Sequence, residues 1–171
     1  GSFNEWGESF DVSHRGENHG VYASGNVYYQ GGFRENSSVR KRNFYYKYFW
    51  DPSDTHRLTL SYLTADAQLG RSGSIRESRL RDLGPKATER PRNFSELDRN
   101  LLSQQYQIKP SDSLALTQNA FFRRSNELSV ANFATFNTFD NELDLSMDSW
   151  GVTVQAEHSK ELFWGLSDNF L

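Results

Sequence analysis

The sequence contains no cysteine, which excludes disulfide frameworks and thiolate metal sites. No segment approaches the roughly eighteen consecutive apolar residues of a transmembrane helix. The net charge is -3, so the chain has no overall basic field that would attract nucleic acid. These absences exclude a disulfide scaffold, a helical membrane protein and a nucleic-acid partner.

Signatures of catalysis and of cofactor binding are absent as well. The four histidines are scattered and do not have the spacing of metal ligands. There is no Gly-x-Ser-x-Gly nucleophile elbow and no glycine-rich nucleotide loop. We therefore expect no enzyme activity, no cofactor and no metal site. A barrel lipase or protease is the catalytic alternative that the sequence leaves open.

Aromatic residues, in contrast, account for 15% of the chain, although its mean hydropathy is only -0.77. A transmembrane β-barrel combines these two features. Its strands alternate lipid-facing with lumen-facing side chains, and its aromatic residues collect at the two membrane interfaces.

The clearest alternation of apolar and polar residues extends from Val39 to Ala67. Phe44, Tyr46, Tyr48 and Trp50 occupy even positions, and Leu58, Leu60 and Tyr62 do so after a turn at residues 51–55. Side chains alternate between faces along a strand, so this segment predicts an antiparallel hairpin with one apolar face. Its strands are about ten residues long, close to the roughly nine to eleven that cross a bilayer.

The same pattern recurs before and after this hairpin. Pro110-Ser111-Asp112 repeats the turn Pro52-Ser53-Asp54, and further strands are predicted near residues 6–15, 21–29 and 150–157. The fold class that this predicts is all-β: an antiparallel up-and-down meander of about seven to eight strands, forming a segment of a large transmembrane β-barrel. Short turns at one end and long loops at the other are typical of outer-membrane barrels. A soluble carbohydrate-binding sheet is an alternative.

Between about residues 66 and 98 the alternation stops, and glycine, proline and mixed charges predominate. We expect a long extracellular loop here, or else a linker between two soluble domains. Guanidinium groups suit carboxylate, phosphate or catecholate oxygens, as an anionic chelate would require. The alternative is that these arginines pair with neighbouring acidic residues or with lipopolysaccharide phosphates. The candidate substrate-binding residues of this and the other long loops are Arg34, Asn36, Arg71, Arg76, Arg79, Arg81, Phe133 and Phe136.

Several short motifs, in order along the chain, resemble one protein family, the TonB-dependent receptors of Gram-negative outer membranes. Leu69 to Ile75 stands where many members carry a Pro-Gly-Ala-Leu-like element, but here the proline is missing. The motifs that carry the resemblance are Gly1-Ser2-Phe3-Asn4, Gly32-Phe33-Arg34-Glu35-Asn36-Ser37 followed by Arg40-Lys41-Arg42, Asp51-Pro52-Ser53-Asp54 before Leu58-Thr59-Leu60, Asp98-Arg99-Asn100-Leu101, and Phe121-Phe122-Arg123-Arg124.

The resemblance implies that residues 1–171 are an early part of the barrel domain of such a siderophore-receptor-like protein, without its plug. A complete receptor of this family imports a ferric siderophore or similar chelate across the outer membrane, with energy from the TonB complex acting through the plug. The wall of its barrel contacts outer-membrane lipid and lipopolysaccharide. An isolated arc would leave sheet edges unpaired in lipid, so we expect a segment of a longer receptor. A complete small barrel of eight strands, with a structural or adhesion role, is the alternative.

Overall fold

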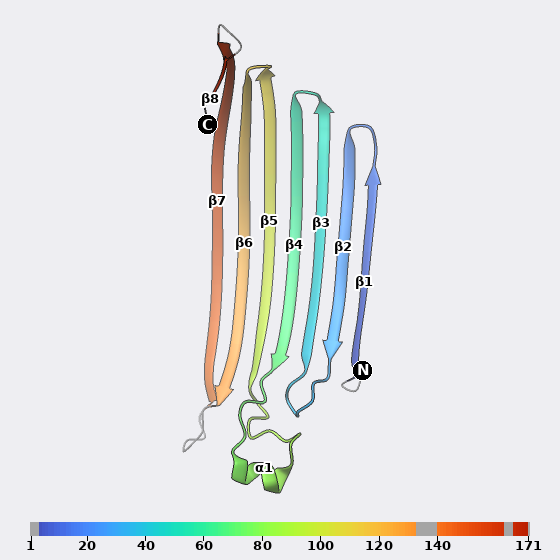
Figure 1. Cartoon of the computed structure of the whole chain (residues 1–171), viewed down its shortest axis with the longest axis vertical. Helices are drawn as coiled ribbons and strands as arrows, with labels where there is room; N and C mark the ends of the chain where they lie inside the picture. Colours follow the sequence, from blue (N-terminus) through green and yellow to red (C-terminus); the bar gives the residue numbers. More distant parts are fainter. Residues whose placement is uncertain (1–3, 133–139, 163–165, 171) are drawn as a thin grey trace.

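A computed structural model describes residues 4–132, 140–162 and 166–170 of the chain. In this part of the chain, each strand pairs antiparallel with its neighbours in sequence, in the order β1 to β8 (Figure 1). The prediction of an all-β antiparallel meander is therefore confirmed. The strands are β1 (Glu5–Arg15), β2 (His19–Gln30), β3 (Val39–Ser53), β4 (His56–Gly70), β5 (Phe94–Ser111), β6 (Leu114–Asn132), β7 (Asp140–Leu162) and β8 (Leu166–Phe170).

The first seven strands are longer than expected, from 11 residues in β1 to 23 in β7. Strand β4 continues through Gly70 and β5 begins at Phe94, so the loop expected at about 66–98 comprises residues 71–93. The strands continue because polar side chains bond across them: Arg42 to Asp66, and Gln68 to Glu96. The segment expected as either a loop or a strand extension after Arg124 is a strand extension, as far as Asn132.

The sheet has one apolar and one polar face, because residues directly opposite each other in an antiparallel pair share a face. The register brings Phe10, Gly25 and Phe44 together on one face, whereas Ser24 and Tyr45 lie on the other. We call the first the apolar face. Its strongly exposed members are Trp6, Phe10, Val12, Phe44, Tyr46, Trp50, Leu102, Phe122, Trp150, Val152 and Val154.

The apolar face packs against nothing within the described part of the chain. No described hydrophobic residue is buried, and Val152 and Trp150 are 58% and 78% exposed. A soluble sheet must bury its apolar face against another layer. The soluble alternative requires a dry interior around such residues as Phe44 and Leu60, and the described residues form none.

The predicted repeat of the turn sequence is also a repeat of structure. The β3–β4 register shifts between Trp50 and Ser53, and the β5–β6 register shifts between Ile108 and Ser111. Each shift contains the proline of its Pro-Ser-Asp turn, because a residue without an N–H group fits a bulge better than a regular ladder. In the two turns, corresponding hydroxyl oxygens lie 3.0 and 3.2 Å apart.

Three glycines within strands are each covered by the aromatic ring directly opposite. The pairs are Gly25 with Phe10, Gly20 with Phe49, and Gly151 with Phe121. A Cβ atom at any of these glycines would lie 2.4 to 2.6 Å from a ring carbon. The rings thus occupy the space that a side chain would need, which explains glycine inside long strands.

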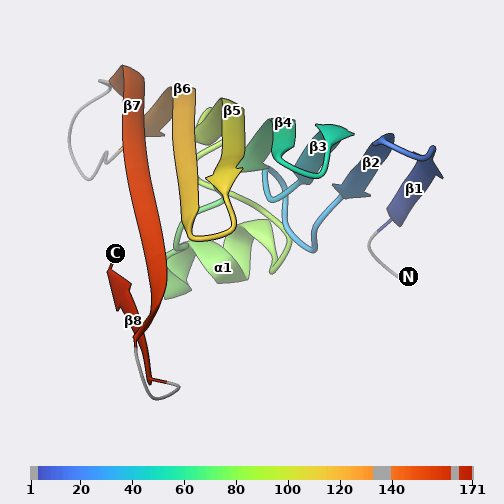
Figure 2. The same ribbon diagram turned by 90° about the horizontal axis from the view of Figure 1, so that it is seen from above.

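The sheet is curved, and the short helix α1 (Glu77–Leu83) lies on the side toward which β1 and β8 bend (Figure 2). Ser95 and Ser129 lie opposite each other on the polar face, at the end of the sheet nearest α1, and both are buried. This burial indicates that the loop containing α1 covers the polar face, which is therefore the concave one. One apolar run, Leu143, Leu145 and Met147, also lies on the polar face.

The sheet is open over the described residues, with β1 paired only to β2 and β8 only to β7. A closed barrel of eight strands requires β1 to pair with β8, so this arrangement does not support the alternative of a complete small barrel. No helix in the described ranges is both long and apolar enough to cross a membrane.

Candidate functional site

The six predicted binding residues that the structure describes gather at the loop end of the sheet. Residues 31–38, between β2 and β3, lie against residues 71–93, between β4 and β5, and the two segments contact each other through several hydrogen bonds. We call them the short loop and the long loop. Both lie at the end of the sheet opposite the Pro-Ser-Asp turns (Figure 1).

Arg34 of the short loop is engaged by the backbone of the long loop. Its Nε and Nη2 donate to the carbonyl oxygen of Ala87 at 3.2 and 2.9 Å, and its Nη1 donates to the carbonyl oxygen of Gly73. A guanidinium group so engaged has few donors left for a ligand. The structure therefore assigns Arg34 to contacts between the two loops.

Asn36 is engaged in the same way. Its Nδ2 donates to the carbonyl oxygens of Asn93 at 2.6 Å, Arg90 at 2.8 Å and Arg71 at 3.4 Å. The backbone N–H of Glu35, between the two side chains, donates to the carbonyl oxygen of Lys86 at 2.7 Å. The short loop thus contacts both ends of the long loop.

Of the four predicted arginines of the long loop, two form ion pairs with carboxylates and two do not. Arg81 bonds to Glu77 one turn earlier on α1 at 3.0 Å, and Arg79 bonds to Glu89 at 3.3 Å. Arg71 and Arg76 are exposed, and their side chains bond to no described residue. Arg71 and Arg76 are therefore the two that offer free guanidinium groups for an anion.

The other two predicted residues, Phe133 and Phe136, lie outside the described residues. Sequence reasoning also missed a set of polar residues on the apolar face, at the loop end of the strands, because their partners become visible only through the register. We call this set the polar belt; it comprises Arg40, Arg42, Asp66, Gln68, Glu96, Asp98, Asn100, Arg124, Asn126 and Asp148.

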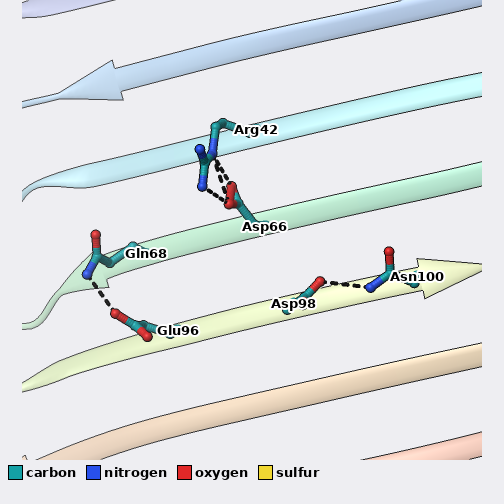
Figure 3. Close-up of polar contacts among 6 residues, drawn as sticks. All are labelled: Arg42, Asp66, Gln68, Glu96, Asp98 and Asn100. Atoms are coloured by element: carbon teal, nitrogen blue, oxygen red, sulfur yellow. Dashed lines mark hydrogen bonds and ion pairs between the residues drawn. The ribbon is translucent and has the colours of Figure 1, made fainter.

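The polar belt is held together by bonds between neighbouring strands and along them (Figure 3). The Nε of Arg42 donates to both carboxylate oxygens of Asp66 at 2.9 Å, and Arg124 bonds to Asp148 at 2.8 Å. The Arg124 guanidinium also lies 5.9 Å from the ring centroid of Phe122, at the boundary with the apolar residues. These ion pairs give Arg42, Asp66, Arg124 and Asp148 partners of opposite charge on the convex face.

The hydrogen bond from Arg42 holds the pKa of the Asp66 carboxyl below its ordinary value, against a smaller opposing effect of desolvation. Asp66 lies in the polar belt, beyond the apolar part of the strand. It therefore stays ionised at neutral pH.

A hollow of about 590 Å³ opens where the polar belt meets the apolar residues. Phe10 and Phe44 line its apolar part, and Arg42, Asp66 and Asp98 line its polar part. Across the described ranges, no group of three or more histidine, aspartate or glutamate residues could hold a metal ion. The arrangement is chemically suited to contact an amphiphile rather than an anion, because its lining holds Asp66 and Asp98 beside an Arg42 that is already paired with Asp66, and it contains no general base positioned beside a nucleophile.

The sequence matches no protein-family model and no curated protein. The fold, in contrast, is similar to that of solved structures. The ferric citrate transporter FecA in its unliganded form superposes with a TM-score of 0.78 at 16% identity, covering 94% of this chain. The ferric-catecholate import receptor Fiu from E. coli K12 gives TM-scores of 0.65 for its open form and 0.60 for its closed form, at 11% and 8% identity and 91% coverage.

These neighbours are TonB-dependent receptors, so the resemblance inferred from the sequence motifs is confirmed at the level of the fold. They are transport or receptor proteins rather than enzymes. The chain spans only 24% to 30% of their length. The shared structure is thus a segment of barrel wall.

Proposed function

We propose that this chain forms part of the barrel wall of an outer-membrane receptor that binds a ferric chelate and takes it up. The observation that carries the proposal is a curved sheet with an uncovered apolar convex face and a polar concave face, which superposes over 94% of its length on a ferric citrate transporter. An apolar face of this extent needs a partner, and a lipid bilayer supplies one.

The dimensions of the apolar face support this orientation. On β6 it extends from Leu114 to Phe122, before the polar belt begins at Arg124. Eight residue steps of about 3.3 Å, tilted by about 40°, span roughly 20 Å of membrane. This approaches the apolar band of about 25 Å that surrounds outer-membrane barrels.

Aromatic residues lie at both limits of the apolar face. Trp50 lies near the turn end, whereas Phe44, Phe122 and Trp150 lie next to the polar belt. Aromatic residues form girdles at both membrane interfaces of outer-membrane barrels. The polar belt would then lie at the level of the lipid headgroups, where lipopolysaccharide is its expected neighbour, and the long loop would be extracellular.

The long loop supplies the proposed contact with the ligand. Ferric complexes of citrate or catecholates carry negative charge, and Arg71 and Arg76 offer planar, permanently charged donors. Arg79 and Arg81 are already paired with carboxylates, so their contribution should be smaller. The TonB complex would supply energy through the plug domain of such a receptor.

The test is a binding measurement on the full-length protein in detergent, with ferric citrate and a ferric catecholate as probes. Replacing Arg71 and Arg76 together by Ala should weaken the binding of one probe by at least about tenfold, because each charge-assisted hydrogen bond contributes roughly 1.5–3 kcal/mol. The matched control replaces Arg79 and Arg81 by Ala and should have a smaller effect. Failure of the unmodified protein to bind either probe would overturn the proposed ligand class.

A further inference from the structure

We propose that the segment Gly32–Ser37 is a latch that fixes the position of the long loop, with Arg34 and Asn36 as positioning residues rather than ligand contacts. The five carbonyl groups that these two side chains bind belong to both ends of the long loop. Arg71 and Gly73 are at its start, and Ala87, Arg90 and Asn93 are at its end. The latch therefore adds to the two bonds that join these stretches directly, from the Arg71 N–H to the Asn93 carbonyl oxygen at 2.9 Å and from the Thr88 hydroxyl to the Ser72 carbonyl oxygen at 2.8 Å.

The latch is preformed by the conformation of the short loop. Asn36 has a φ of 52°, in the left-handed region that asparagine tolerates better than most residues, and Gly32 has a φ of 75°. The backbone N–H of Arg34 donates to the Ser37 hydroxyl at 3.1 Å, which closes the turn. These features direct both side chains toward the long loop.

The neighbouring strand makes room for the latch. A Cβ atom on Gly70, the last residue of β4, would lie 2.8 Å from the backbone carbonyl carbon and oxygen of Asn36. The backbone N–H of Gly70 donates to the carbonyl oxygen of Ser38 at 2.8 Å. Any larger residue at position 70 would displace Asn36 from its three carbonyl acceptors.

Within the long loop, the helix α1 is weakly fixed: the Arg79–Glu89 pair at 3.3 Å joins it to the second half of the loop. Its helix α1 has seven residues, none of them buried, and its N-cap residue Arg76 makes no side-chain cap. Leu80 and Leu83 of α1 are 37% and 47% exposed. Isolated helices of this length are marginal in water, so the position of α1 depends on bonds that the rest of the loop and the latch supply.

The latch has a consequence for binding, and this part of the inference rests on the proposed function. Arg71 lies in the segment that the latch holds, because its carbonyl oxygen accepts from Asn36. Losing the latch would spread the free guanidinium groups of Arg71 and Arg76 over many positions. An anionic chelate would then bind more weakly although neither arginine had changed.

The experiment uses two variants of the full-length protein that break the latch without removing bulk. Asn36→Asp removes both N–H donors and keeps the size of the side chain, and Arg34→Lys keeps the charge but loses the planar fork. Glu35→Gln is the matched control, because only the backbone of Glu35 contacts the long loop. Amide hydrogen exchange of residues 71–93 is the main measurement, with β4 and β6 as internal references.

We expect exchange in residues 71–93 to become at least about tenfold faster in Asn36→Asp and Arg34→Lys, because several hydrogen bonds are lost. Exchange in β4 and β6, and in the Glu35→Gln control, should be unchanged. Unchanged exchange of the long loop in both latch variants would overturn the proposal.

Binding of ferric citrate and of a ferric catecholate to the same variants separates the latch from a direct ligand role. Weaker binding together with faster loop exchange supports the latch. Weaker binding with unchanged loop exchange would make Arg34 or Asn36 a ligand contact and refute it. If the unmodified protein binds neither probe, the proposed function fails, and the exchange measurement still decides the latch.

Discussion

Replacing Leu60 by arginine should destabilise the protein strongly in a membrane. Leu60 lies in the middle of the apolar part of β4, on the same face as its direct partners Tyr48 and Gln104. Arginine near the midplane on the lipid face of a barrel costs about 2–4 kcal/mol. Such a cost lowers the equilibrium constant for folding by about 30- to 700-fold.

The adjacent residue provides the control. Thr59 faces the opposite side, where it pairs with Phe49 and Gln105. An arginine there would point toward the concave, polar side, so Thr59→Arg should cost much less than Leu60→Arg. The two variants introduce the same side chain one residue apart. The difference between their stabilities therefore reports the face on which the arginine lies.

The assay is reversible urea unfolding of the full-length protein in liposomes, followed by tryptophan fluorescence. We expect the midpoint to fall for Leu60→Arg and to stay close to that of the unmodified protein for Thr59→Arg. Equal losses in the two variants, or a greater loss in Thr59→Arg, would refute the assignment of the apolar face to lipid.

Two further predictions concern local contacts. Gly151→Val should cost about 0.5–1.5 kcal/mol in the same unfolding assay, because its Cβ would lie 2.6 Å from the exposed Phe121 ring and the ring must leave its present rotamer; an unchanged midpoint would show that the ring moves at no cost. Arg42→Gln should lower stability equally at pH 5 and pH 8, and its effect should fade below about pH 4, as shown by thermal unfolding across that range. The reason is that the pKa of Asp66 is lowered in the folded state, so the pair stabilises the protein above the ordinary pKa and loses this effect as pH falls through the folded value. An effect of Arg42→Gln that persists undiminished at pH 2 would contradict this account.

The sequence was sufficient to predict the alternating central part of most strands and the faces of its side chains, because a period of two is a direct property of an extended chain. The hairpin expected from Val39 to Ala67 is the β3–β4 pair, and its apolar residues share one face. The sequence was not sufficient to predict where the strands end. Alternation is lost beyond Asp66, and the bonds that extend the sheet there depend on which residues the register places opposite.

The candidate site was only partly predictable for a related reason. The Gly32–Ser37 motif marked the right segment, but Arg34 and Asn36 were expected to contact a ligand. Their donors meet backbone carbonyl groups that lie 35 to 57 residues away in sequence. Nothing in the order of side chains reports where a distant carbonyl group will lie, so these bonds, and the positioning role proposed from them, could be recognised only in three dimensions.

The proposed orientation places even-numbered side chains of β4 against lipid and odd-numbered ones toward water. Spin labels placed one at a time at residues 57–62 of the full-length protein in liposomes test it most directly, by relaxation with oxygen and with a water-soluble nickel chelate. We expect a period of two: oxygen should relax the labels at residues 58, 60 and 62 more strongly, and the nickel chelate those at residues 57, 59 and 61. Access to the nickel chelate at all six positions, or an alternation of the opposite phase, would contradict it.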